Sequence, residues 1–431
     1  MDDGRERILR PRSRPARGAG DLTKLDIDSL RAEVESLFRP RAEPACGPHA
    51  VGAELELIPV ETVTHRVVPV VAPRDGGSLA VIRRVAAAQG WKEIPAGDDP
   101  PSWSISDGWR LSFEPGGQLE ISSAPCESAS ALVDRMLEIV ESLRREFDRQ
   151  SIDLMPVGVD PCNHIRDVPL VLHRERYTRM TDYFDRIHES GVQMMRQSAS
   201  IQINVEIGPE PLKRWQLLNA LTPYLTGMFA NSPIYRGVAT GDRSYRAHLW
   251  RTLDPSRTGL PFDAANPAGA YFDFAMDAGA IMRNGESGWS SFRDWIGEGS
   301  PTIDDWRVHL TTLFPEVRPR SWFEVRSVDS IGPEWIVAPI ATVCGIAYPQ
   351  GVSTRAMALL GKPSTELLWL AGEKGLADEH LAETSVLLAE MALEGMDDLG
   401  DEFLTPRHRD RVREFFDRYT FRKRAPADDR A

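Results

Sequence analysis

Polar and apolar residues alternate with a period of two in four separate segments of the chain, and this pattern constrains the fold more than any other feature. Successive side chains of a strand point to opposite faces of a sheet, so residues two apart share a face. In the first segment Glu54 and Glu56 share one face, while Ala53, Leu55 and Leu57 share the other. The alternation predicts a half-buried strand.

The other three segments repeat this arrangement. Their polar faces, in chain order, are Gln118, Glu120 and Ser122; Gln202, Asn204 and Glu206; and Arg320, Trp322, Glu324 and Arg326. The residues between them are mostly Leu, Ile, Val and Phe. Each strand therefore has an apolar face for helices to cover and a face of carboxylates, amides and guanidiniums. We predict one antiparallel sheet that is covered on one face.

Helical periodicity surrounds these strands. Helices are expected over 25–38, 78–89, 128–150, 174–189, 211–229 and 303–313, and 335–418 is expected to be mostly helical. Strands are expected over 50–60, 108–124 (two short strands), 151–159, 197–207 and 320–328. The pattern predicts an α+β fold in one domain spanning 23–420. Residues 1–22, rich in Arg, Pro and Gly, are predicted to be a disordered basic tail, and 421–431 a second disordered tail.

The polar face has two interpretations. Half-exposed antiparallel strands are common, so it could be an ordinary solvated surface. Against this, the four polar faces contain no Lys and no Thr. Carboxylates two residues apart repel each other unless a cation lies between them, and Mg²⁺ is commonly held by carboxylates together with substrate phosphates. Arginine matches phosphate and carboxylate with paired hydrogen bonds. We interpret the four strands as an active-site cup.

The run Glu114-Pro115-Gly116-Gly117-Gln118 precedes the second strand. Pro fixes one φ angle and paired glycines permit tight or left-handed backbone, so the turn could bring Glu114 and Glu120 to the same ion. A plain hairpin turn is the alternative.

Composition and missing motifs exclude several function classes. The net charge of −13 argues against nucleic acid as a partner. No apolar stretch reaches the roughly 18 residues that predict a membrane span. The four cysteines contain no CxxC pair, which argues against structural zinc or a disulfide framework and suits a reducing cytoplasm. The chain lacks GxxxxGK[ST], GxSxG and HExxH, and no GxGxxG follows a strand.

Several motifs resemble the glutamate–cysteine ligases of the plant and bacterial type, in order from about residue 50 to 335. They are Gly52-Ala53-Glu54-Leu55-Glu56, Phe113-Glu114-Pro115-Gly116-Gly117-Gln118-Leu119-Glu120, Ser200-Ile201-Gln202-Ile203-Asn204, Phe229-Ala230-Asn231-Ser232-Pro233, and the block from His309 to Arg326. The last block is most similar to the actinobacterial branch that makes γ-glutamylcysteine for ergothioneine. The Gly-Gly turn looks nearer the plant form, and Asn204-Val205-Glu206 replaces a common Asn-Leu-Asp run.

The resemblance implies a glutamine-synthetase-like catalytic sheet and an ATP-dependent ligase. It would join glutamate to cysteine through a γ-glutamyl phosphate, with two or more Mg²⁺ ions. It also implies small-molecule partners alone (glutamate, cysteine and ATP), a cytoplasmic location, and a monomer or homodimer. The open alternatives are a ligase that uses another amine, a guanidino-kinase-like phosphotransferase of the same broad fold, and a silent ATP-binding protein.

Roles for individual residues follow from the resemblance. The expected magnesium ligands are Glu54, Glu56, Glu114, Glu120 and Glu324. Gln202 and Asn204 would lie near the nucleotide, and Gln118 would bind substrate. Arg326 would steady the transferring phosphoryl group and Arg246 would hold a carboxylate of glutamate. Glu324, Arg326 and Arg318 are the expected catalytic residues, although a surface ion pair is an equal alternative for Arg318.

Overall fold

The computed structural model describes residues 25–40, 46–73, 76–106, 108–263, 265–283, 290–299 and 301–430. The predicted tail over 1–22 lies outside the described residues. The strands of the main sheet are β1 (Val51–Glu61), β2 (Lys92–Ala96), β3 (Asp99–Ser104), β4 (Arg110–Phe113), β5 (Leu119–Ser122), β6 (Ile152–Met155), β7 (Ser200–Val205), β10 (Val317–Pro319) and β11 (Phe323–Asp329). A separate hairpin joins β8 (Ile234–Tyr235) and β9 (Val238–Ala239).

The main sheet has nine strands in the order β10-β11-β7-β1-β5-β4-β3-β2, with β6 paired to β1 off this path. Every strand pair is antiparallel. The four segments with alternating polarity contribute β11, β7, β1 and β5, which are consecutive neighbours in the order. The expected strand over 320–328 begins later, because Arg320 and Trp322 lie in the turn between β10 and β11. The prediction of an antiparallel sheet is therefore confirmed. The four strands that carry the acidic, amide and arginine side chains are neighbours within it.

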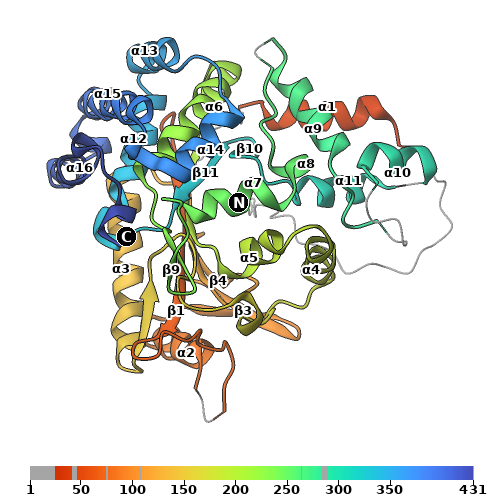
Figure 1. The fold of residues 1–431 in the computed structure, drawn as a ribbon, viewed down its shortest axis with the longest axis vertical. Coiled ribbons are helices and arrows are strands. Elements are labelled where there is room, and N and C mark those ends of the chain that lie inside the picture. The colour runs from red at the N-terminus through yellow and green to blue at the C-terminus, as the bar shows by residue number, and fades with distance from the viewer. Residues whose placement is uncertain are drawn as a thin grey trace, which may run out of the picture.

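Helices surround this sheet (Figure 1). They are α1 (Ile27–Leu37), α2 (Ser78–Gln89), α3 (Ala129–Asp148), α4 (Glu175–Ile187), α5 (Glu189–Gln197), α6 (Pro211–Met228), α7 (Tyr245–Leu253), α8 (Pro255–Thr258), α9 (Pro267–Asp277), α10 (Phe292–Glu298), α11 (Ile303–Leu310), α12 (Val337–Ala347), α13 (Gln350–Leu360), α14 (Thr365–Lys374), α15 (Glu379–Phe403) and α16 (Pro406–Arg418).

Helix α3 shows how the apolar face is covered. Ser128 caps the helix, because its hydroxyl accepts the N–H of Ala131 at 3.1 Å. The buried stripe that includes Leu132, Met136 and Val140 belongs to the same core as the inward face of β1. In Figure 1, α3 lies on one side of β1 and β4, and α4 and α5 lie on the other. The polar face of the sheet is thus left for α4, α5 and α7 to border.

The sequence did not predict β2, β3 and the elements between β7 and β10 other than α6 and α11. Strand β3 contains Pro100 and Pro101, and proline within a run normally argues against a central strand. Helices α7 and α8 have nine and four residues, too few to establish a helical period. These elements are ordered by tertiary contacts rather than by a local pattern.

The predicted disorder of 421–431 is contradicted for the described part of that segment. Residues Thr420–Arg422 and Pro426–Asp429 form 3₁₀ turns, and Ala425 and Ala427 are buried together with Ala230. The N–H of Ala427 donates to the Ala230 carbonyl at 2.8 Å. Small alanines carry no visible apolar stripe, so only the tertiary structure could reveal this packing.

Within the described residues, no single helix has the length and apolar composition needed to cross a membrane. One bent pair, Pro333–Ala347 with Gln350–Leu360 at 94°, passes on length and composition alone. The helix within its first half, α12, is buried at every position, as expected of a helix in a protein core.

Truncation of Leu55 to Ala should destabilise the fold by about 2–5 kcal/mol, because it opens a cavity between β1 and its covering helices. Leu55 is 1% exposed. Denaturant unfolding would measure the loss, with Leu359→Ala as a control, since Leu359 is 36% exposed. Equal free energies of unfolding for the two variants would contradict this description of the core.

Candidate active site

The register of the sheet places the predicted acidic residues on one face. Glu56 of β1 pairs with Glu120 of β5, and Glu54 pairs with Ser122 on one side and Gln202 of β7 on the other. Directly paired residues share a face. The predicted convergence of the first three polar strands is therefore observed.

Strand β11 completes this face, and we call the whole surface the cup. Glu324 pairs with Asn204 of β7, and Arg318 of β10 pairs with Glu324. The register then shifts between Val325 and Val328, so that an extra residue is accommodated opposite β7. Because of this bulge, Asp329 pairs with Ser200 and lies on the polar side, while Val325 and Val328 remain in the core.

Glu324 is the centre of an ion-pair cluster. It is 1% exposed, its carboxylate accepts from Arg318 Nη2 and from Arg326 Nη1, and it forms an ion pair with Arg320 Nε at 3.1 Å. Burial alone would raise the pKa of Glu324, but the three guanidiniums hold it well below the ordinary value. Burial and the neighbouring Arg320 lower the pKa of Arg318 to about 9. The surface ion pair considered for Arg318 is excluded, because this pair is buried.

The other carboxylates have fewer cationic partners. Glu56 accepts from the Ser200 N–H at 2.7 Å, the Ser200 hydroxyl at 3.1 Å and Gln202 Nε2 at 3.0 Å. Burial and the Glu120 carboxylate nevertheless raise its pKa. Burial, with Glu324 and Glu120, raises the pKa of Glu54 to about 8. Burial and Glu120 raise the pKa of Glu114 well above its ordinary value.

Two buried arginines border this acidic cluster with unpaired donors. The Cζ atom of Arg246 lies 4.7 Å from the centroid of the Trp250 ring, and the Cζ atom of Arg326 lies 5.7 Å from the same centroid. Arg246 Nη2 donates to the Arg326 carbonyl at 2.8 Å. The Nε of each has no hydrogen-bond partner among the described residues. Buried donors without an acceptor are costly, so these two guanidiniums suit an anionic ligand.

Sequence reasoning missed Arg176 and Tyr177, at the start of α4. Arg176 Nη2 donates to the Thr311 carbonyl at 2.9 Å, and its Nε is another unpartnered buried donor. Burial lowers the pKa of Arg176 despite the opposing attraction of Tyr177 and Glu114. Burial and Glu114 raise the pKa of Tyr177 to about 12. The surrounding stretch is rich in Arg and Glu and resembles an exposed helix, so no local signal marked these residues.

Gln118 and Asn204 have protein partners in place of ligands. Gln118 Oε1 accepts the Gly116 N–H at 3.0 Å, and its Nε2 donates to the Ser198 carbonyl at 2.9 Å. These contacts fix the turn that carries Glu114, so substrate binding by Gln118 stays a prediction. Asn204 Oδ1 accepts from Trp322 Nε1 at 3.1 Å, and its contact with nucleotide also stays a prediction.

The turn itself requires its glycines. A Cβ on Gly116 would lie 2.0 Å from the Arg196 carbonyl oxygen, and Gly117 has a φ of +91°. The turn connects β4 to β5, so the hairpin interpretation is correct. Glu114 and Glu120 also lie close enough to raise the pKa of Glu114, as the ion-binding interpretation requires.

The donor set fits Mg²⁺ in chemistry, since Glu54, Glu56, Glu114 and Glu120 offer only oxygen ligands. No three His, Cys, Asp or Glu side chains among the described residues form a ready-made metal site. The sequence-based premise that only dications could reconcile these acids is therefore incomplete, because arginines, hydroxyls and raised pKa values also compensate them. Magnesium binding remains a prediction, with substrate phosphates expected to complete the coordination.

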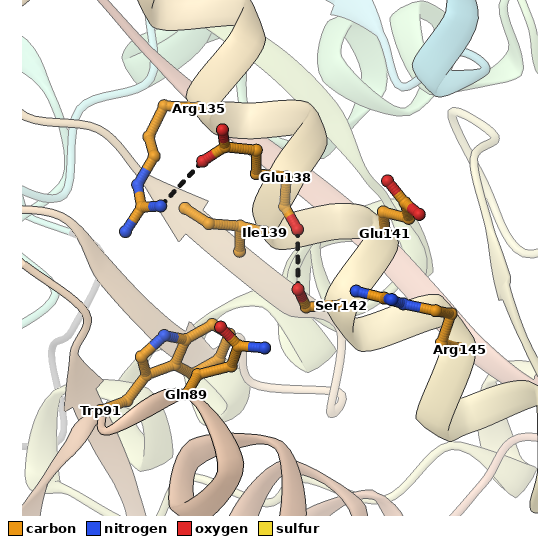
Figure 2. Close-up of a pocket in the computed structure, with 8 residues that line it drawn as sticks. All are labelled: Gln89, Trp91, Arg135, Glu138, Ile139, Glu141, Ser142 and Arg145. Carbon is orange, nitrogen blue, oxygen red and sulfur yellow. Dashed lines mark hydrogen bonds and ion pairs between the residues drawn. The ribbon is translucent and has the colours of Figure 1, made fainter.

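A separate pocket of about 240 Å³ lies beside α3 and the end of α2 (Figure 2). It is lined by Gln89, Trp91, Arg135, Glu138, Ile139, Glu141, Ser142 and Arg145. Arg135 and Glu138 form an ion pair of 2.8 Å there. The pocket is formed around α3, which covers the apolar face, and it contains none of the predicted site residues. We therefore place the candidate active site in the cup.

Comparison with known proteins decides the family. The model of "Glutamate-cysteine ligase family 2(GCS2)" matches residues 50–395. The chain belongs to this family. It is 32% identical over 358 residues to glutamate–cysteine ligase EgtA of Mycolicibacterium smegmatis, covering 79% of this chain and 81% of that protein. All five predicted carboxylates and Arg246, Arg318 and Arg326 fall within the matched range.

More distant similarities agree in fold. The chain is 30% identical over 290 residues to the chloroplastic glutamate–cysteine ligase of Nicotiana tabacum, covering 63% of this chain and about half (55%) of that protein. The glutamate–cysteine ligase of Francisella tularensis, solved in complex with AMP, superposes with a TM-score of 0.52 at 12% identity. That superposition covers 89% of this chain and 84% of the other. The predicted α+β fold is confirmed, and the superposition shows that this ligase has the same overall fold.

The raised pKa of Glu54 predicts a pH-dependent stability. Its folded pKa of about 8 lies above the ordinary value of 4.5. The folded state therefore binds the proton more tightly than the unfolded state, and the free energy of unfolding should fall as pH rises from about 4.5 to 8. Glu54→Gln should stabilise the metal-free protein at pH 8 and change little at pH 4.5.

Denaturant unfolding in the presence of a chelator at several pH values would measure this. Glu141→Gln is the matched control, because Glu141 is exposed on α3. A Glu54→Gln variant with the pH slope of the wild type would contradict the assigned pKa.

Proposed function

We propose that this chain is an ATP-dependent ligase that forms γ-glutamylcysteine from L-glutamate and L-cysteine through a γ-glutamyl phosphate. One observation carries the proposal: in a chain of this family, Glu54, Glu56, Glu120 and Glu324 lie on one sheet face, with Glu114 in the adjoining turn. Two buried arginines with unpaired Nε donors, Arg326 of β11 and Arg246 of α7, border these acids. No nucleophilic side chain is required, because a phosphorylated carboxylate is itself the activated group. This agrees with a site rich in acids and arginines.

The first step is transfer of the γ-phosphoryl group of ATP to the side-chain carboxylate of glutamate. Catalysis of such a transfer consists mainly of positioning and charge neutralisation. Arg326 is held in place by Glu324 and Gln202, so its remaining donors can meet the phosphoryl oxygens. Arg246, buried against Trp250, would bind a carboxylate of glutamate. Magnesium, held by Glu54, Glu56, Glu114, Glu120 and Glu324, would neutralise phosphate charge.

The second step is attack of the cysteine amine on the acyl carbon. The amide bond forms, inorganic phosphate leaves, and the amine proton passes to a carboxylate of the cup. None of the four protein cysteines has a role in this scheme.

The predicted setting of the enzyme follows from the same proposal. We infer that its partners are the small molecules glutamate, cysteine and ATP. Similarity to glutamate–cysteine ligase EgtA of Mycolicibacterium smegmatis supports the reaction. A role in ergothioneine biosynthesis, which the motif resemblance implies, stays a prediction. A cytoplasmic location, the absence of nucleic-acid and membrane partners, and a monomeric or homodimeric state stay predictions.

A panel of amines tests the acceptor. With glutamate, ATP and Mg²⁺ supplied, cysteine should release phosphate and ADP in equal amounts and yield γ-glutamylcysteine, detected by mass spectrometry. Phosphate release with a different amine, but not with cysteine, would favour the ligase of other specificity. ADP without phosphate, together with a phosphorylated guanidino compound, would favour the kinase.

Replacement of Glu120 or Glu324 by Ala should abolish turnover, because each removes an acid from the centre of the cup. We expect a loss of at least about a hundredfold in kcat/KM, a magnitude common for electrostatic stabilisation of a transition state. Glu141→Ala is the control. Thermal unfolding should accompany the assay, because Glu324→Ala removes the carboxylate that pairs with two buried guanidiniums, Arg318 and Arg326. Near-normal turnover in either cup variant would contradict the scheme.

A further inference from the structure

Asp329 is a buried carboxylate that the scheme above does not use. It ends β11, is 1% exposed, and accepts three short hydrogen bonds. The donors are the Asn231 N–H at 2.8 Å, the Ser232 hydroxyl at 2.7 Å and the Ser244 hydroxyl at 2.9 Å. The bulge in β11 places this carboxylate on the polar side of the sheet. A carboxylate with this many fixed donors is a rigid anchor.

The hydroxyls of Ser232 and Ser244 also bind backbone N–H groups of helix α7, and so connect Asp329 to this helix. Ser244 caps α7, because its hydroxyl oxygen accepts the Ala247 N–H at 3.1 Å. The Ser232 hydroxyl oxygen accepts the Arg246 N–H at 3.1 Å. Arg246 Nη1 also lies 3.8 Å from Asp329 Oδ1. The Asp329 carboxylate thus lies near the Arg246 guanidinium and is also connected, through Ser232, to the Arg246 backbone N–H.

The C-terminal end of α7 is fixed by a second set of contacts, to the β10–β11 hairpin and the residues just before it. Arg251 forms a buried ion pair with Glu316, and Glu316 also accepts from the Ser327 hydroxyl at 2.6 Å. Trp250 Nε1 donates to the Phe314 carbonyl at 2.8 Å. With both ends of the helix fixed to the β10–β11 region, three groups set the direction of the Arg246 side chain: the Arg326 carbonyl, the Trp250 ring and the Asp329 carboxylate. Of these three, only Asp329 also connects to the Arg246 backbone, through Ser232.

The C-terminal segment 425–430 supports the Asn231 loop from outside. Arg430 Nε donates to Asn231 Oδ1 at 2.7 Å, and the Ala427 N–H donates to the Ala230 carbonyl at 2.8 Å. Asp428 lies 3.2 Å from Arg243, which precedes the cap of α7. These contacts account for the Phe229-Ala230-Asn231-Ser232-Pro233 motif, whose residues connect the C-terminal segment to Asp329.

We propose that Asp329 is the positioning residue for Arg246, and that residues 425–430 are the outer part of the same support. The inference rests on the proposed function, in which Arg246 binds a carboxylate of glutamate. Arg246 has a buried Nε without a partner, so a small change of direction removes a donor from the ligand without removing the charge. The effect should therefore fall on glutamate affinity rather than on ATP.

The main test is Asp329→Asn, assayed by ADP release with glutamate, cysteine and ATP varied in turn. We expect the KM for glutamate to rise about tenfold, the size of a lost charge-assisted contact, with the KM for ATP unchanged. In an Arg246→Lys background the same change should add little, because coupled residues are not additive. Calorimetric glutamate binding should follow the KM.

Arg430→Ala is the second variant. It leaves Asp329 and its three hydrogen-bond donors in place, so it remains informative if Asp329→Asn fails to fold. It should raise the KM for glutamate by a smaller factor in the same direction. Arg355→Ala is the matched control, since Arg355 is an exposed arginine of α13 that pairs with Glu394 of α15.

The outcomes separate the two proposals. Wild-type protein without glutamate-dependent ADP release would overturn the proposed function. If the wild type is active, a folded Asp329→Asn with normal glutamate affinity would overturn the inference, and so would full additivity with Arg246→Lys. If Asp329→Asn does not fold, an Arg430→Ala variant with normal glutamate affinity would overturn it.

Discussion

The arrangement of the cup depends on how buried carboxylates are compensated on a single sheet face. Removing an ion from water costs several kcal/mol unless partners replace the solvent. Glu324 has three guanidiniums, and Glu56 has donors from Ser200 and Gln202. Glu54 and Glu114 have burial and like charges around them, and their pKa values rise in consequence. The cup therefore has one ionised, arginine-bound side and one side whose carboxyl groups keep their protons to higher pH.

This division gives the two sides different tasks. The arginine-bound side is fixed before any ligand arrives, and Arg246 and Arg326 retain unpaired Nε donors there. On the other side, deprotonation of Glu54 and Glu114 as pH rises would supply the oxygen ligands of the Mg²⁺ ions that the proposed function requires. Positioning of anionic substrates and neutralisation of phosphate charge can thus occur on adjacent strands of one rigid sheet.

Much of the motif block from His309 to Arg326 is scaffold around this site. His309 is buried, its ring nitrogen contacts the Ala275 carbonyl at 2.7 Å, and burial lowers its pKa to about 3. Arg257 Nη1 donates to the Thr312 carbonyl at 2.9 Å, and Glu316 anchors α7. The three predicted catalytic residues of this block, Arg318, Glu324 and Arg326, all lie in the cup, and Arg320 pairs with Glu324 beside them. A family motif can therefore mark support as well as chemistry.

The sequence by itself determined which strands carry the acids and which face they share, because the period of two is a local property of the backbone. It thereby predicted the antiparallel sheet, and the resemblance added the roles of its residues. The tertiary structure alone decided which strands are neighbours and that Glu324 pairs with three arginines. It also decided that Arg176 lies near enough to Glu114 of the cup to interact with its charge. It also decided that a bulge brings Asp329 to the polar side and that 425–430 packs on the Asn231 loop. These features depend on contacts between residues far apart in the chain, and no local periodicity encodes such contacts.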